Sequence, residues 1–145
     1  MYRVFYTIAL IILFAGNTFA QKFEFSGNRK RETLAFRMIK NQMVIQLHIN
    51  GKGPYNFILD TGVGLVLISD PKLIDSVSFQ NLRSIYITGF GEGEKISAFI
   101  APSVDLRIGN TIAKNIPAAI LKKDIFELSN YVGIPIHGLI GYEFF

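Results

Sequence analysis

The residues most able to do chemistry are Asp60, Thr61 and Gly62, which stand between two apolar segments. Residues 57–59 read Phe-Ile-Leu and residues 65–68 read Leu-Val-Leu-Ile, a pattern typical of buried strands. A carboxylate between two such segments is costly unless it is hydrogen-bonded or functional. The chemistry open to it is general acid–base catalysis, which on a carbonyl group usually takes a pair of carboxylates.

The turn itself has a mechanical use. Gly62 allows the backbone to turn tightly and to present the Asp60 side chain at a surface. The Thr61 hydroxyl can turn inward and hydrogen-bond to backbone, which would hold the loop against its neighbour. We therefore expect a loop that fixes its carboxylate in one position, as catalysis by positioning requires.

A partner carboxylate is not obvious in the chain. None of the other aspartates is followed by Thr-Gly or Ser-Gly, and these are Asp70, Asp75, Asp105 and Asp124. We expect the second carboxylate from another copy of the chain, related by a two-fold axis that brings Asp60 against its symmetry mate. The alternative source is a second Asp-Thr-Gly-like lobe beyond Phe145.

The elements that must position Asp60 are predicted to be strands. Residues 43–49 alternate apolar and polar side chains, which is the period of a half-buried strand. Gly and Asn in residues 50–54 favour a hairpin turn, and residues 55–59 return as the strand that ends at Asp60.

The rest of the chain is also mostly β. Two strands are expected at residues 84–88 and 95–100, joined by a glycine-rich tip. Residues 104–108 alternate again and lead into a Gly-Asn turn. Short helices are expected at residues 70–77, where Asp70 can act as a cap, and at 124–129.

The first twenty residues predict export. Arg3 precedes an apolar run, and small residues lead to a cleavage site near Ala20. The run is only about a dozen residues, whereas a membrane-spanning helix needs roughly twenty, so we expect no stable membrane anchor. The protein is then periplasmic or secreted, and because it has no cysteine it forms no disulfide.

Composition argues against several other functions. The net charge is +4, and the basic cluster at residues 29–31 has no aromatic platform beside it, so no nucleic-acid binding is expected. His48 and His137 are too far apart in the sequence to suggest a metal pair, and no cofactor is predicted. After the leader we divide the chain into a polar segment, residues 21–33, and one domain, residues 34–145.

Three segments together resemble the retropepsin-like aspartyl protease family, in particular exported bacterial members that often carry a following PDZ domain. The matching segments are INGKGPYNFILDTGVG, ITGFGEGEKISAF and GLIGYEFF. The resemblance implies a mostly all-β fold, a closed β-barrel or acid-protease lobe with one or two short helices. Because the chain stops on two aromatic residues, we expect the domain to continue beyond Phe145.

The resemblance also implies roles for individual residues. Asp60 matches the catalytic aspartate, Thr61 the residue whose hydroxyl braces two catalytic loops against each other, and Gly62 the loop glycine. Leu139, Ile140 and Gly141 match the hydrophobic-hydrophobic-glycine step that packs beneath the loop. The flap, a hairpin that closes over an extended substrate, matches Gly89, Phe90, Gly91, Glu92 and Gly93.

The implied activity is that of an aspartic endopeptidase, which hydrolyses peptide or protein substrates with a water held between paired aspartates. One departure from the family pattern is Val63, which follows Asp-Thr-Gly where the family usually has Ala or Ser. This bulkier residue favours a second interpretation, an inactive peptide-binding or scaffolding module. A third, a β-barrel carrier with a chance Asp-Thr-Gly, leaves the glycine-rich tip unexplained.

Overall fold

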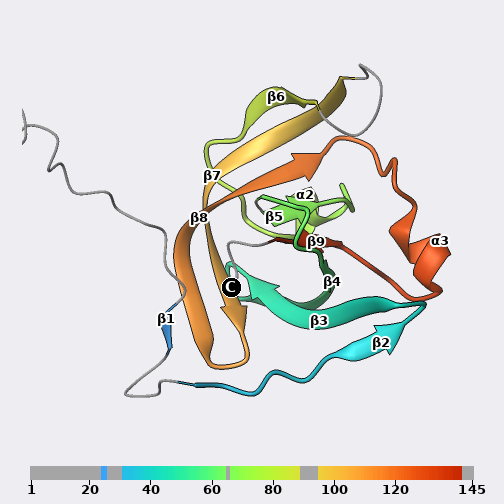
Figure 1. Ribbon diagram of the computed structural model, residues 1–145. Coiled ribbons are helices and arrows are strands. Elements are labelled where there is room, and N and C mark those ends of the chain that lie inside the picture. Colours follow the sequence, from blue (N-terminus) through green and yellow to red (C-terminus); the bar gives the residue numbers. More distant parts are fainter. Residues whose placement is uncertain (1–23, 26–30, 65, 89–94, 142–145) are drawn as a thin grey trace, which may run out of the picture.

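The computed structural model describes residues 24–25, 31–64, 66–88 and 95–141. Within these ranges the chain is mostly β, with two short helices, as predicted (Figure 1). The predictions for the leader at residues 1–20, the flap at residues 89–93 and the chain end from residue 142 lie outside the described residues. Neither of the helices described here is long and apolar enough to cross a membrane.

The elements follow the chain in this order: β1 (Glu24–Phe25), β2 (Arg37–Ile39), β3 (Gln42–Ile49), β4 (Lys52–Leu59), β5 (Val66–Ile68), α2 (Leu73–Ser76), β6 (Arg83–Ile87), β7 (Ile96–Ile108), β8 (Thr111–Leu121), α3 (Leu128–Val132) and β9 (Gly138–Ile140). The alternation that predicted β3 is present, since Ile45, Leu47 and Ile49 are buried while Gln46 is exposed. The same period in β7 buries alternate residues up to Ile108.

Six strands close into a ring, in the order β7, β8, β5, β9, β4, β3 and back to β7. β6, β2 and β1 extend it by pairing with β7, β3 and β8. The ring is not a regular barrel, because β7 and β8 have 13 and 11 residues while β5 and β9 have three each. Figure 1 shows the long β7–β8 ribbon curving around the short central strands.

β9 lies between β4 and β5. It runs parallel to β4, with Ile58 opposite Leu139, and antiparallel to β5, with Leu67 opposite the same residue. The two strands that flank Asp60 are therefore not paired with each other, although they are neighbours in the sequence. The loop between them has to pass over the end of β9.

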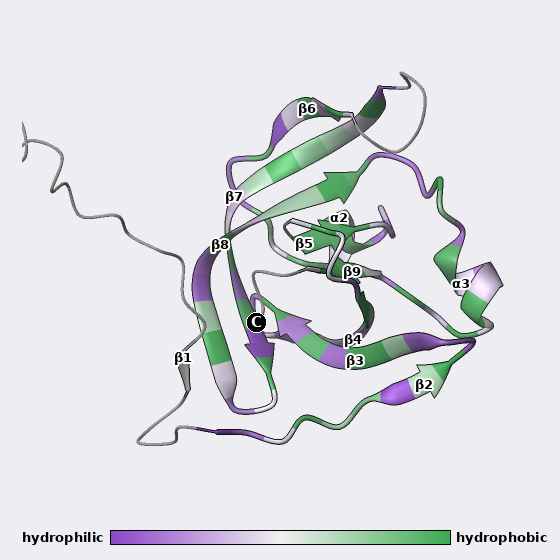
Figure 2. Ribbon diagram, viewed as in Figure 1, coloured by the Kyte–Doolittle hydropathy of each residue, from purple (hydrophilic) through white to green (hydrophobic). Residues whose placement is uncertain are grey.

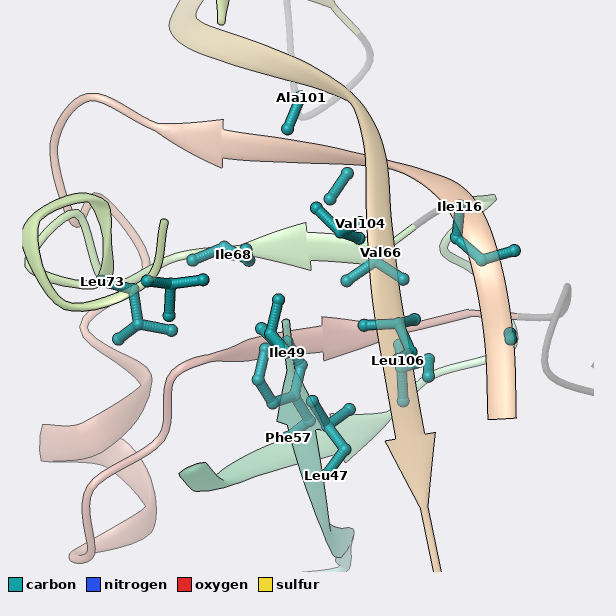
Figure 3. Packing of buried hydrophobic residues seen from close by; sticks show 14 of the residues in the cluster. Leu47, Ile49, Phe57, Val66, Ile68, Leu73, Ala101, Val104, Leu106 and Ile116 are labelled. Atoms are coloured by element: carbon teal, nitrogen blue, oxygen red, sulfur yellow. The ribbon is translucent and has the colours of Figure 1, made fainter. Parts of the chain in front are cut away.

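The central strands are buried on both faces because two hydrophobic clusters enclose them. In β4, Phe57 belongs to one cluster and Ile58 to the other, and in β5 Ile68 and Leu67 divide in the same way. Figure 3 shows Phe57 and Ile68 within the first cluster. In Figure 2 the central strands β5 and β9 are mainly hydrophobic. This double burial explains why the segments around Asp60 read as continuous apolar runs.

Three predicted elements differ from the structure. The first helix is shorter than expected: it begins at Leu73, with Lys72 and not Asp70 at its N-cap position and no side-chain cap. The segments expected as separate strands at residues 95–100 and 104–108 form the single strand β7, whose pairing register with β8 shifts around Ala101 and Val104. The second helix begins at Leu128, because the Asp124 carboxylate accepts the Glu127 N–H in a turn and Glu127 has a left-handed φ of 47°.

The N-terminal segment also contacts the ring. The Glu32 carboxylate accepts hydrogen bonds from the Asn110 backbone N–H (2.7 Å), the Asn110 side chain (3.0 Å) and the Thr111 hydroxyl (2.9 Å). β1 pairs with β8 at the same hairpin. Part of the polar segment at residues 21–33 thus packs on the turn between β7 and β8.

Candidate active site

Asp60 is the first residue after β4, and its backbone ties the loop to β9. The Asp60 N–H donates to the Ile140 carbonyl oxygen at 3.0 Å. The Asp60 carbonyl oxygen in turn accepts the Val63 N–H at 3.1 Å, which closes a tight turn. Both ends of the turn are thereby fixed relative to β9, and the Asp60 side chain is left half-buried beside it.

The carboxylate of Asp60 is itself oriented. Its Oδ1 accepts the Gly62 N–H at 2.9 Å, the local bond that aspartate commonly makes two residues ahead in a turn. A Cβ at Gly62 would come 3.1 Å from this Oδ1, which is tighter than ordinary contact. No described residue donates to Oδ2, so one oxygen is held while the other can bind water or a partner group.

The backbone approaches the loop closely at Gly141, the residue that follows β9. A Cβ at Gly141 would lie 1.7 Å from the Val63 carbonyl oxygen and 2.5 Å from the carbonyl carbon. Only glycine allows the two backbones to come so near. Ile140 and Gly141 therefore support the Asp60 loop directly, whereas Leu139 contributes its side chain to the second cluster.

Val63 fits this loop. Its backbone closes the turn, and its half-buried side chain packs against the second hydrophobic cluster. Thr61, in contrast, is exposed, and its hydroxyl makes no hydrogen bond with any described residue. The expected inward hydrogen bond of this hydroxyl is not among those made by the described residues, and its role as a brace between two loops stays a prediction.

A cavity of about 450 Å³ opens beside Asp60. Its lining comes from four parts of the chain and is mainly apolar, comprising Gln42, Ile58, Asp60, Gly62, Val63, Phe126, Leu128, Tyr131 and Leu139. Asp60 is the only carboxylate among these residues. The cavity can therefore hold an apolar side chain next to a group capable of acid–base chemistry.

The sequence did not reveal the wall that α3 adds to this cavity. Phe126, Leu128 and Tyr131 follow Asp60 by more than sixty residues, and no motif marks them. The structure brings Asp60, Gly62 and the step at residues 139–141 together, and their functional roles stay predictions. Within the described ranges no group of His, Cys, Asp or Glu residues could hold a metal ion.

Comparisons with known proteins give a matching family and a similar fold. A family model described as aspartyl protease matches residues 45–144. The fold is similar to the crystal structure of a retropepsin-like aspartic protease from Rickettsia conorii, with a TM-score of 0.52 and 16% sequence identity. That match covers 85% of this chain and 82% of the other. No curated protein sequence matches the chain.

Proposed function

Because this chain belongs to the aspartyl protease family, we propose that it is an aspartic endopeptidase whose active site pairs Asp60 with a second aspartate. The observation that carries the proposal is the orientation of Asp60. Its loop is bonded to Ile140 and packed on Gly141, and one carboxylate oxygen is held by Gly62 beside an apolar cavity. This is the preorganisation that general acid–base catalysis needs.

The proposed reaction is direct hydrolysis. Two carboxylates in contact cannot both carry a charge cheaply, so the pair holds one proton and a water molecule between them. The charged carboxylate takes a proton from the water as its oxygen attacks the peptide carbonyl carbon, and the protonated one donates to the carbonyl oxygen. The C–N bond then breaks as the nitrogen receives a proton, which releases an amine and a carboxylic acid.

The second aspartate is proposed to be Asp60 of another copy of the chain. The exposure of Thr61 supports this, since an exposed loop tip is free to meet its symmetry mate. A second lobe beyond Phe145 is the alternative source, and a PDZ domain beyond Phe145 remains compatible with either. The flap at residues 89–93 is proposed to close over a peptide that lies in an extended form.

We also propose that the protein is exported after cleavage near Ala20, so that it acts in the periplasm or outside the cell. The basic start and the apolar run of the first twenty residues support this. Removing the charge of Arg3 and placing a charged residue at the centre of the apolar run should leave the full-length chain inside cells. Cell fractionation measures this directly.

The decisive experiment compares Asp60→Asn with Asp75→Asn on a mixed peptide library. Asp75 is an exposed carboxylate of α2 that lies away from the cavity, so its variant controls for charge and handling. We expect the Asp60 variant to lose cleavage and the control to keep it, with activity greatest below neutral pH because the pair must hold a proton. Equal cleavage by the two variants would refute the proposed mechanism.

Mixing tests the source of the second aspartate. If a dimer forms one site and Asp60→Asn inactivates it, equal amounts of the two chains leave about a quarter of the full activity. An activity of half would mean that each chain works independently, which favours an internal second lobe. Wild-type protein that binds peptides but cleaves none at any pH would instead support the inactive peptide-binding module.

A further inference from the structure

The outer wall of the cavity beside Asp60 is a short helix that has little stability of its own. α3 has five residues and makes no side-chain cap at its start, and left-handed residues precede and follow it, Glu127 with a φ of 47° and Gly133 with a φ of 86°. Helices of this length depend on contacts with the rest of the protein. Leu128 and Tyr131 line the cavity, so what holds α3 also sets the shape of the cavity.

One side of α3 is anchored by its own neighbours. Val132 is buried in the second cluster, and the Ser129 hydroxyl both accepts the Ile136 N–H at 2.9 Å and donates to the Ile136 carbonyl oxygen at 3.1 Å. The opposite side is open, since the Tyr131 side chain is 54% exposed. A second contact is needed there to keep the helix from moving outward.

The Tyr131 carbonyl oxygen lacks the partner that a longer helix would give it. In a continuing helix this oxygen would accept the N–H of residue 135, but residue 135 is proline and has none. The carbonyl is at the C-terminal end of α3, where the helix dipole favours a positive charge. A cation that donates a hydrogen bond suits this position.

Lys40 supplies that cation from a distant part of the sequence. Its Nζ donates to the Tyr131 carbonyl oxygen and lies 5.3 Å from the centroid of the Tyr131 ring. Lys40 and Asn41 form a tight turn between β2 and β3, with φ values of 47° and 62°. The β2–β3 hairpin thus presents the ammonium group to the end of α3.

The same hairpin forms the other side of the cavity. Gln42, two residues after Lys40, lines it together with Asp60. We propose that Lys40 is a positioning residue that holds α3 against the β2–β3 hairpin and so sets the width of the cavity. This rests on the proposed function: if the chain is a peptidase, the cavity beside Asp60 would take an apolar side chain of the peptide next to the bond to be cut.

The test uses the full chain with Lys40→Met, Lys40→Arg and Lys52→Met. Methionine keeps an unbranched side chain in the left-handed turn but has no charge, and arginine keeps the cation. Lys52 is an exposed lysine at the start of β4, in the neighbouring hairpin, and its side chain makes no hydrogen bond with a described residue. Its variant controls for the loss of one positive charge.

The first measurement is amide hydrogen exchange of residues 129–133, which needs no activity. Loss of one hydrogen bond is expected to speed exchange in Lys40→Met by roughly fivefold. Lys40→Arg and Lys52→Met should resemble the wild type. Unchanged exchange in Lys40→Met would overturn the proposal, because Lys40 would then not hold α3.

The second measurement is the affinity for two peptides with a reduced, uncleavable bond, one with Phe and one with Ala beside it. Wild-type protein should bind the Phe peptide more tightly than the Ala peptide. This preference should fall by roughly fivefold in Lys40→Met, since binding of the Phe side chain must then also fix the position of α3. An unchanged preference overturns the role in specificity. A Phe preference without any cleavage by wild-type protein would refute the peptidase and leave the role of Lys40 intact.

Discussion

The close packing of Gly141 under the Asp60 loop can be tested with Gly141→Ala. In the structure a Cβ at this position would lie 1.7 Å from the Val63 carbonyl oxygen, whereas ordinary contact begins at 3.4 Å. The obstacle is backbone and not the end of a flexible side chain, so it cannot rotate away. The loop that contains Asp60 has to retreat by about 1.7 Å, or β9 has to move by the same amount.

Both stability and activity should suffer. Overpacking of this kind costs about 1–3 kcal/mol in the free energy of unfolding. A shift of about 1 Å in a positioned catalytic group lowers the rate by roughly a hundredfold. We therefore expect Gly141→Ala to lose stability moderately and to lose kcat, per folded molecule, almost completely.

Gly138→Ala, at the first residue of β9, is the matched control, whereas Gly141 directly follows that strand. A Cβ at Gly138 would lie 2.2 Å from the Leu67 carbonyl oxygen and 2.6 Å from the Phe57 ring, so it too is overpacked. Gly138 is at the opposite end of β9 from the loop. Its variant should lose a similar amount of stability, by chemical denaturation, while keeping the kcat of the folded fraction.

The two variants separate support of the loop from support of the fold. Equal losses of kcat per folded molecule would mean that β9 acts only through global stability. A Gly141→Ala protein that is as stable and as active as the wild type would refute the reasoning, because the close approach to Val63 would then not constrain the loop.

Two further predictions concern positions away from Asp60. Glu32→Gln should lower the free energy of unfolding by about 1–3 kcal/mol, because the neutral amide loses the charge that strengthens the hydrogen bonds from Asn110 and the Thr111 hydroxyl. An unchanged midpoint of chemical denaturation would contradict this. Burial first, and the Arg107 guanidinium second, hold the pKa of His48 in the folded protein below 6.5, so protonation of His48 lowers the free energy of unfolding as the pH falls from 6.5 through that folded pKa. An NMR titration should show a His48 midpoint below 6.5, and in Arg107→Gln the midpoint should rise but stay below 6.5. A wild-type midpoint at or above 6.5 would contradict this.

Much of the local structure could be predicted because its determinants lie close together in the sequence. The alternation around Ile45 and Leu47 specifies one buried face, and the left-handed φ of Asn50 and Gly51 agrees with the expected hairpin turn. The predicted β-rich fold is confirmed by the strands of the structure and by its similarity to a retropepsin-like protease. The second helix was placed too early because the Asp124 side chain stabilises a turn there instead of a helix start.

The candidate site could be predicted only in part. Asp60, Gly62 and Gly141 carry a readable pattern, and the structure places them together. The cavity wall could not be found, since Tyr131 has no motif and its partner Lys40 is 91 residues away. The catalytic role of Asp60 stays a prediction, which the Asp60→Asn variant tests.

By itself, the sequence determined the strands that lead to and from Asp60, the hairpin turn at residues 50–51 and which carboxylate stands between two buried segments. Those features follow from side-chain period and backbone preferences over a few residues. Only the tertiary structure decided that β9 separates β4 from β5, that Gly141 has to be glycine and that α3 faces Asp60. These depend on contacts between residues far apart in the chain, which arise only when the ring closes and each backbone finds its hydrogen-bond partner.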